Sequence, residues 1–379
     1  MSPGRISYGF LSSAPPTPCG LATFTVALAT NLEHEGNTVS LVRVLDDEEF
    51  TRSAKVPVIG ELIASDPRTV ESATKALNRC DVVIIQHEFG LYGGEDGDNL
   101  LEVLHGLRVP AIAILHTVLS QPSAHQRDVL NEVISSVDAV VAMTHSAARV
   151  VDSIYTLGPT PLHVIAHGAV VGNRTLRHFG ETRPIILTWG LIGPGKGIEW
   201  VIDAMAELQD VTPLPLYVVA GRTHPKVFAQ QGERYRQMLR QRVSDHGVAD
   251  LVQFDDSYRD VVSLTSLIES ADVVVLPYDS KDQATSGVLV DAVAAGRPVV
   301  ATAFPHACEL LQSGAGLVVA RGDAHAIATS IRRVLEDPEF AADMAREARR
   351  LSSALDWRAV AAQYSHLSDS LLFRESAIA

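Results

Sequence analysis

The segment LTWGLIGPGKGIEWVIDAM combines a glycine-rich turn and one lysine between a strand pattern and a helix pattern. Glycine lets the backbone approach a ligand closely, and the first amides of the following helix attract an anion. Lys196 adds a positive charge beside Gly195 and Gly197, as expected at a phosphate or diphosphate site. The spacing matches neither the Walker loop nor the dinucleotide fingerprint. An ordinary strand–helix turn with a solvated lysine is the alternative.

The segment DQATSGVLVDAVAAGRPVV carries a carboxylate, Asp291, in a helix pattern that is apolar nearly all round. The helix would begin around Ser286 and Gly287 and direct its dipole and first amides at a ligand. Because a buried acid needs a partner, Asp291 would either accept hydrogen bonds from vicinal hydroxyls, such as those of a ribose, or pair with a nearby Arg or Lys. Gln283, in the preceding loop, could bind a sugar hydroxyl without charge.

Composition narrows the class of protein. The chain has 379 residues and a formal net charge of −14. This length predicts two domains of roughly 150–200 residues, and the acidic charge argues against nucleic-acid binding and a broadly basic membrane face. Three scattered cysteines without metal-ligand spacing predict a reducing compartment, no disulfide framework and no structural zinc. With neither a secretory signal nor a transmembrane segment in the sequence, we expect a cytoplasmic protein.

Short apolar runs alternate with helix patterns along the chain, which is typical of parallel α/β units. The expected strands are residues 5–13, 37–45, 81–88, 110–117, 138–144, 162–168, 184–190, 214–221, 251–257, 272–278, 297–303 and 316–320. The expected helices include residues 21–36, 198–209, 264–271 and 355–373. The polar stretch 170–184 is the candidate linker between two doubly wound sheets. Such folds bind ligands at the carboxyl ends of their strands.

The second half resembles the nucleotide-sugar domain of the retaining glycosyltransferases of family 4. That family has a Gly-Arg…Lys-Gly loop, then two glutamates eight residues apart, then EAMAAGTPVVA. Here WGLIGPGKG matches the loop, and DAVAAGRPVVA matches the last motif with Asp291 at the second glutamate and Gln283 at the first. LIESADVVVLPY and ELLQSGAGLVVARGD also match in order, and Trp357 matches the family's closing tryptophan.

The first half resembles the same family in fewer places. In PPTPCGLATFTVALATNL, Gly20 lies at the entrance of a helix. IQHEFGLYGG and ILHTVLSQP place His87 and His116 at the carboxyl ends of successive strands, and VIAHGA, with His167, resembles the family's IPHGVD. In the family the histidine at the position of His116 contacts the donor sugar or the acceptor. For each of these histidines, a hydrogen-bonded structural role is the alternative.

The resemblance implies an α/β protein with the GT-B fold, in which two Rossmann-like doubly wound domains face each other across a cleft. We expect an acceptor-side domain at residues 1–175 with a C-terminal helix at about 360–379, and a nucleotide-sugar domain at residues 176–359.

The implied activity is retaining, metal-independent transfer of a hexose of the mannose or glucose type to a hydroxyl acceptor. The donor would be a nucleotide diphosphate sugar, a co-substrate rather than a cofactor, and the acceptor a sugar, glycan or lipid-linked molecule. Peripheral membrane contact stays open. The alternatives are another GT-B enzyme, such as an epimerase or a phosphorylase, and a non-catalytic nucleotide-sugar binder.

The resemblance also implies roles for single residues. Asp291 would bind the ribose, Gln283 the donor sugar and His116 the reacting centre. The phosphates would be bound by Lys196, by the amides near Gly195 and Gly197, and by the helix start at Ser286, Gly287 and Val288. The family arginine beside the lysine is Leu191 here, and Arg222 or Lys226 could supply the missing cation. Gln283 keeps its hydrogen-bonding ability, but its neutral side chain excludes carboxylate catalysis at that position.

Overall fold

The computed structural model describes residues 5–15, 17, 19–46, 55–172, 183–257, 259–281 and 283–378, with side chains up to 373. The chain divides into two compact units. Unit 1 comprises residues 1–168 and 357–379, and unit 2 comprises residues 169–356. The expected domain boundary between residues 175 and 176 lies outside the described residues.

Unit 1 contains a parallel sheet that has seven strands within the described ranges, in the order β3-β2-β1-β4-β5-β6-β7. Its strands are β1 (Ser7–Ser12), β2 (Thr38–Leu45), β3 (Val58–Ile63), β4 (Val82–His87), β5 (Ala111–Leu115), β6 (Ala139–Ala142) and β7 (Leu162–Val164). The strand order reverses between β1 and β4, and ligands of doubly wound sheets bind beside such a reversal.

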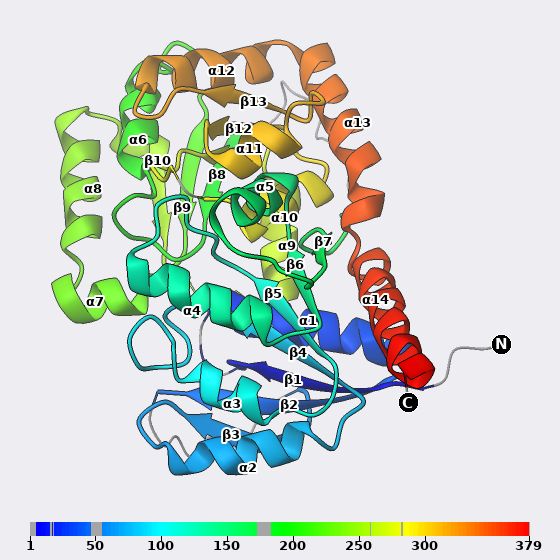
Figure 1. Cartoon of the computed structure of the whole chain (residues 1–379). Coiled ribbons are helices and arrows are strands. Elements are labelled where there is room, and N and C mark those ends of the chain that lie inside the picture. Colours follow the sequence, from blue (N-terminus) through cyan, green and yellow to red (C-terminus); the bar gives the residue numbers. More distant parts are fainter. Residues whose placement is uncertain are drawn as a thin grey trace. The chain divides into compact units, whose positions relative to one another are not determined.

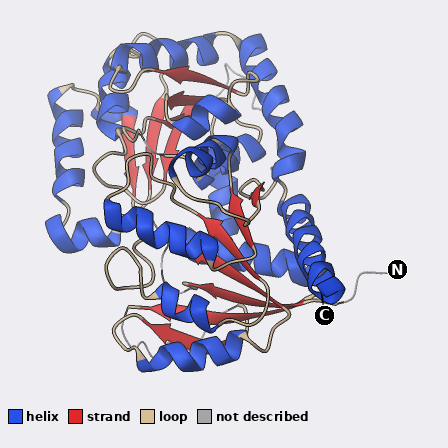
Figure 2. Ribbon diagram, viewed as in Figure 1, coloured by secondary structure: helices blue, strands red, loops and turns tan. Residues whose placement is uncertain are grey.

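The helices of unit 1 flank this sheet (Figure 2). They are α1 (Gly20–His34), α2 (Arg68–Leu77), α3 (Leu100–Gly106), α4 (Ala124–Ser135), α5 (His145–Ile154) and α14 (Trp357–Ile378). Buried residues of α1 and α14, such as Leu28 and Val360, pack with strand residues such as Phe10 and Ile84 into one core. The last helix therefore belongs to the first unit, although it lies at the other end of the sequence (Figure 1).

Unit 2 contains a second parallel sheet, which has six strands in the described part of the chain, in the order β10-β9-β8-β11-β12-β13. Its strands are β8 (Ile185–Trp189), β9 (Leu216–Ala220), β10 (Val252–Asp255), β11 (Val273–Leu276), β12 (Val299–Thr302) and β13 (Gly316–Val319). Here the order reverses between β8 and β11.

Helices also flank the sheet of unit 2 (Figures 1 and 2). They are α6 (Ile198–Ala206), α7 (Pro225–Gln231), α8 (Arg234–Asp245), α9 (Val261–Ser270), α10 (Gly287–Ala294), α11 (Pro305–Leu310), α12 (Ala324–Glu336) and α13 (Pro338–Leu355). Apolar residues of α6, α8 and α12 pack on β8, β9 and β11 to form its core. Nearly continuous apolar strands such as VVVL at β11 are buried throughout, as expected when helices cover both faces of a parallel sheet.

The expected strands and helices are confirmed, with ends that differ by a few residues. The sequence pattern does not identify β3, an edge strand whose first residues, Val58 and Ile59, are exposed and which contains Gly60. The expected architecture of two Rossmann-like doubly wound domains is confirmed, whereas the cleft between them stays a prediction. Among the described residues, no helix is long and apolar enough to cross a bilayer.

Candidate functional site

A pocket of about 310 Å³ opens in unit 2 where the strand order reverses. The loop after β8 contributes Pro194, Gly195 and Lys196 to its lining. The loop after β11 contributes Tyr278, Asp279, Ser280 and Gln283. Adjacent parallel strands end at the same edge of a sheet, so two loops far apart in sequence meet there. The pocket therefore brings the glycine-rich loop next to Gln283 of the second segment that the sequence singles out. Its lining does not include the other expected site residues of that segment, Ser286, Gly287, Val288 and Asp291.

Gly195 and Gly197 both have left-handed backbones, with φ of 82° and 67°. A Cβ atom at Gly197 would lie 1.8 Å from the carbonyl oxygen of Pro277, so this glycine is required by the contact between the two loops. A Cβ atom at Gly195 would meet nothing within 4 Å. Only Gly195 thus lines an open space, while Gly197 precedes α6 and holds the loop against the end of β11.

Lys196 is partly buried, with its ammonium nitrogen 4.5 Å from the centre of the Tyr278 ring. Burial lowers the pKa of this ammonium group. Within the described residues the structure gives it no carboxylate partner. A buried cation without a counter-ion is unfavourable on its own, so this arrangement favours an anionic ligand in the pocket.

Ser286 caps α10, as the sequence predicts. Its hydroxyl oxygen accepts a hydrogen bond of 3.3 Å from the amide of Leu289, and its own amide donates to Nδ1 of His306 at 2.9 Å. The first bond inside the helix runs from the Val290 amide to the Ser286 carbonyl. The amides of Gly287 and Val288 precede that bond and so have no partner inside the helix, as is typical of amides that bind an anion at a helix N-terminus.

Asp291 lies in the second turn of α10, and burial raises the pKa of its carboxyl group to about 7. In the part of the chain that the structure describes, no cation pairs with it and no donor bonds to its carboxylate. The expected alternative, an ion pair with a nearby Arg or Lys, is therefore wrong for the described residues. Arg297, the nearest arginine in sequence, instead donates to the carbonyl oxygens of Ala295 and Glu269.

Gln283 lines the pocket, but its amide nitrogen donates to the carbonyl oxygen of Thr285. This bond holds the loop before α10 and leaves the side-chain oxygen of Gln283 for other partners. A role toward the donor sugar stays a prediction.

The two candidate replacements for the missing arginine at Leu191 lie beside the glycine-rich loop. Ile192 forms a β-bridge with Thr223, and its amide donates to the Arg222 carbonyl at 2.8 Å. The Arg222 guanidinium is exposed and donates to the carbonyl of Asp256. Burial lowers the pKa of His224, and the charges of Lys226 and then Lys196 lower it further, so both ammonium groups lie near His224. Neither Lys226 nor Arg222 is in the pocket lining.

In unit 1, Gly20 is the first residue of α1 and is exposed. The helix is capped by Cys19, whose sulfur accepts from the Ala22 amide at 3.3 Å and lies 3.0 Å from the Ser13 hydroxyl. The capping role of Cys19 is not expected from its residue type, because oxygen side chains are the usual N-caps.

Three histidines follow strands of the unit 1 sheet: His116 and His167 lie against Phe24 of α1, and the ring of His87 meets that of Phe89. The Phe24 ring meets His116 and His167 edge-on, each at 5.0 Å between centroids. Burial lowers the pKa of His116 to about 3, with smaller effects of His167 and His87, and it lowers the pKa values of those two to about 4. All three are therefore neutral imidazoles at pH 7.

His116 has one partner that the sequence does not reveal. Its Nε2 lies 2.5 Å from the side-chain oxygen of Gln86, the residue before His87. His167 bonds the Gly168 carbonyl through Nδ1 at 2.7 Å, which fits the structural alternative for that histidine. Tyr278 is the second site residue that sequence reasoning misses, since a tyrosine after a buried strand reads as core.

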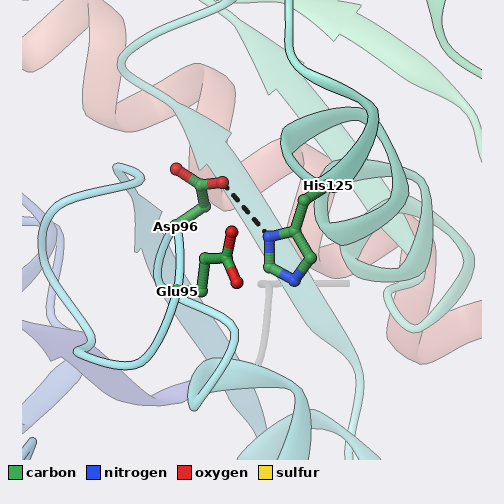
Figure 3. A group of neighbouring side chains, drawn as sticks. All are labelled: Glu95, Asp96 and His125. Carbon is green, nitrogen blue, oxygen red and sulfur yellow. Dashed lines mark hydrogen bonds and ion pairs between the residues drawn. The ribbon is translucent and has the colours of Figure 1, made fainter.

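Among the described residues, one group could hold a metal ion: Glu95, Asp96 and His125, whose ligand atoms lie within 4.8 Å of one another (Figure 3). The carboxylate of Asp96 already bonds Nδ1 of His125 at 3.1 Å and accepts a hydrogen bond of 3.1 Å from the side-chain amide nitrogen of Gln126. The bond to Asp96 raises the pKa of His125, which favours its protonated form over a metal-binding one. Asp96 and His125 therefore already bond each other, and the expectation of a metal-free protein stays a prediction.

Two family models match the chain. The model described as glycosyl transferases group 1 matches residues 176–351. The model described as glycosyltransferase family 4 matches residues 18–171. Together they span both units, apart from the chain ends.

Several characterised proteins are similar in sequence. D-inositol 3-phosphate glycosyltransferase of Corynebacterium glutamicum is 25% identical over 299 residues, which are 71% of this chain and 68% of that protein. Alpha-D-kanosaminyltransferase of Streptomyces kanamyceticus is 30% identical over 46% of this chain and 42% of its own length. Glycogen synthase of Mycobacterium tuberculosis is 31% identical over 44% of this chain and 37% of its own length. The chain thus matches less than half of the last two proteins.

Solved structures share the fold over nearly the whole chain. Sucrose-phosphate synthase from Thermosynechococcus elongatus has a TM-score of 0.75 at 18% identity. The match covers 98% of this chain and 100% of that protein's chain. HepE from Anabaena, crystallised in complex with UDP-glucose, has a TM-score of 0.71 at 17% identity, covering 97% and 100%.

Proposed function

Since the chain belongs to the group 1 glycosyltransferases and has their GT-B fold, we propose that it transfers a hexose, of the glucose or mannose type, from a nucleotide diphosphate sugar to a hydroxyl acceptor with retention of configuration and without a metal. The observation that carries the donor assignment is the pocket between the loops after β8 and β11, where Lys196 has no carboxylate partner among the described residues. The UDP-glucose bound to HepE agrees with a donor of this class.

The phosphates are assigned to groups that already converge on this edge of the sheet. Lys196 and Gly195 line the pocket, and the amides of Gly287 and Val288 begin α10. In such a transfer negative charge develops on the leaving diphosphate while positive charge develops on the sugar ring. Cations and oriented amides that are in place before the reaction stabilise that developing charge. Lys226, whose charge lowers the pKa of His224 as that of Lys196 does, is our candidate for the missing arginine, with Arg222 as the second choice.

Asp291 is assigned to the ribose. Its carboxylate has no described partner, and paired bonds from two vicinal hydroxyls would satisfy it. Gln283 is assigned to the donor sugar, as a neutral hydrogen-bonding group. His116 is assigned to the donor sugar or the acceptor, where its neutral imidazole offers a hydrogen bond without charge.

The test is a transfer assay with the purified chain, UDP-glucose or GDP-mannose as donor and a panel of sugar and lipid-linked acceptors. NMR of the product gives the anomeric configuration, and retention is expected. Added EDTA should leave the rate unchanged if the reaction is metal-independent. An inverted product would contradict the retaining mechanism, and a rate restored only by divalent cations would contradict metal independence.

Lys196→Ala is expected to lower kcat/KM for the donor by about 10-fold to 1000-fold, because it removes a positive charge from the pocket lining. Lys75→Ala, an exposed lysine on α2 of unit 1, is the matched control and should transfer normally.

The main alternative of a different class is a non-catalytic nucleotide-sugar binder, which Leu191 and Gln283 favour because both replace charged family residues. If the protein binds UDP-glucose or GDP-mannose but transfers the sugar to none of the acceptors tested, the result would support a non-catalytic nucleotide-sugar binder. A changed sugar in the absence of acceptor would indicate an epimerase, and release of sugar phosphate with inorganic phosphate would indicate a phosphorylase.

A further inference from the structure

Gln86 is a polar residue in an apolar position. It precedes the last residue of β4, a strand paired on both sides by β1 and β5, and its side chain is fully buried. Its backbone carbonyl accepts the hydroxyl of Tyr92 at 2.8 Å, but any residue could supply that carbonyl. A buried amide side chain costs free energy unless both of its ends are hydrogen-bonded.

The amide of Gln86 is only half satisfied. Its oxygen lies 2.5 Å from Nε2 of His116, while its nitrogen is buried and has no hydrogen-bond partner among the residues that the structure describes. Methionine or leucine would fill the same space without an unpaired donor. The structure therefore offers one reason for glutamine at this position, its bond to His116.

We propose that Gln86 is a positioning residue. Its side-chain oxygen accepts a hydrogen bond from the Nε2–H of His116 and so holds this histidine as the tautomer whose Nδ1 lone pair can accept a hydroxyl hydrogen bond. The role of that lone pair rests on the proposed function, in which His116 contacts a hydroxyl of the donor sugar or the acceptor. The bond between Gln86 and His116 exists without substrate and is testable by itself.

The surroundings of the imidazole support this assignment. Nδ1 of His116 has no hydrogen-bond partner among the described residues. It is also not among their fully buried side-chain atoms that lack a partner, so it can be reached by a ligand. The edge of Phe24 meets the ring at 5.0 Å and restricts its rotation. Burial, His167 and His87 all disfavour the protonated ring, so His116 stays neutral at the pH of catalysis. A neutral ring has one donor and one acceptor nitrogen, and the group bonded to the first determines which nitrogen is the second.

The experiment reads the tautomer directly. Full-length protein is labelled with 15N-histidine, and long-range 1H–15N spectra are recorded between pH 6 and pH 8 without substrate. The signal of His116 is assigned by its loss in His116→Asn. We expect a protonated Nε2 and an unprotonated Nδ1 in the wild type, and a mixture of tautomers in Gln86→Met.

Gln126→Met is the matched control. This variant removes another glutamine of unit 1, whose amide binds Asp96 instead of a histidine, and it should leave the His116 signals unchanged. In the transfer assay Gln86→Met is expected to lower kcat by about threefold to tenfold with little change in the donor KM, the size expected when one neutral hydrogen bond no longer orients its partner.

Two results would overturn the proposal. A protonated Nδ1 in the wild type would mean that the amide is reversed and that Gln86 donates to His116. An unchanged tautomer in Gln86→Met would mean that other contacts hold the ring. The wild-type spectrum needs no variant, so the proposal can be tested even if Gln86→Met does not fold. If the wild type transfers no sugar, the proposed function fails while the tautomer measurement still decides the role of Gln86.

Discussion

Two ionisable residues of unit 2, Lys196 in the pocket lining and Asp291 in α10, carry charges that folding by itself does not favour. Burial lowers the pKa of Lys196 and raises that of Asp291, and the structure gives neither group an oppositely charged partner among its described residues. Perturbed ionisable groups of this kind gather at functional sites, where a ligand supplies what the protein lacks. The two residues carry opposite charges and so suit different parts of one ligand, the phosphates and the ribose.

Asp291 gives a prediction for stability against pH. Its carboxyl pKa is about 7 in the folded protein, and about 3.9 is expected in the unfolded chain. Between these values the unfolded chain releases a proton that the folded protein keeps, so this group lowers the free energy of unfolding as pH rises, up to about pH 7. Asp291→Asn removes this decline in the free energy of unfolding. In urea unfolding, the free energy of unfolding of the variant minus that of the wild type should therefore increase by about 1–3 kcal/mol from pH 5 to pH 8.

Asp152→Asn, which changes an exposed carboxylate on α5, is the control and should shift stability equally at both pH values. A constant difference between Asp291→Asn and wild type would show that Asp291 is ionised normally. The same variant should bind the nucleotide less tightly, so a gain in stability would come with a loss of affinity.

Tyr278 gives a second prediction at this scale. Its ring lies under the Lys196 ammonium, and its hydroxyl bonds the Ser286 side chain at the start of α10. Tyr278→Leu should weaken the binding of UDP or GDP by about 2-fold to 10-fold, measured by calorimetry, because a cation–π contact is lost. Tyr278→Phe keeps the ring, so its loss of binding free energy should be less than half of the loss in Tyr278→Leu. Equal losses in the two variants would assign the contribution to the hydroxyl instead.

At the scale of elements, two strand–loop–helix units place the pocket. The loop between β8 and α6 meets the loop between β11 and α10 through a hydrogen bond of 3.0 Å from the Asp279 amide to the Gly195 carbonyl. The amide of Ser286 is in turn fixed by His306 of α11. The start of α10 is thus held by a neighbouring element, so a ligand there need not order it.

The two glycines of the loop between β8 and α6 have different roles: Gly197 is needed for packing against Pro277, whereas Gly195 lines the pocket. Gly197→Ala should lower the free energy of unfolding by more than about 2 kcal/mol, since its Cβ would overlap the Pro277 carbonyl and its φ is 67°. Gly195→Ala has only the left-handed backbone to oppose it and should cost about 1–2 kcal/mol. Urea unfolding compares the two. If Gly195→Ala were the more destabilising variant, the contact between the loops would not be the reason for Gly197.

At the scale of the molecule, the chain consists of two parallel sheets in separate units, and the last helix returns to the first unit. Apolar residues at the start of α14, Trp357 and Val360, complete the core of unit 1. The ring of Trp357 contacts Phe24 at 5.0 Å and lies against Gly168, where a side chain would overlap it. The tryptophan that the sequence matches to a family motif therefore has a packing role in unit 1.

Ligand binding should stabilise the whole chain. UDP or GDP at about 100 times its dissociation constant adds about 2.7 kcal/mol to the free energy of unfolding, which corresponds to a rise of about 3–4 °C in the apparent Tm. Thermal-shift measurements should show this rise in wild type and Lys75→Ala and not in Lys196→Ala. A shift that persists in Lys196→Ala would place the nucleotide elsewhere.

The sequence by itself determined the fold class, the two series of strands and the segments that form the pocket, because these depend on local periodicity, glycine positions and helix caps. It placed the start of α10 at Ser286 and the start of α6 after Gly197, where the structure has them. It did not identify β3, since a half-exposed edge strand lacks the continuous apolar pattern of its neighbours.

Only the tertiary structure decided which side chains meet. The bond between Gln86 and His116, the position of Tyr278 under Lys196, and the lack of a described partner for Asp291 all depend on strand order and on how neighbouring loops pack. Residues some 30 to 80 positions apart come into contact there, at distances that no local pattern encodes. The sequence therefore indicated which residues could do chemistry, and the packing of the sheets determined which groups are left unpaired to do it.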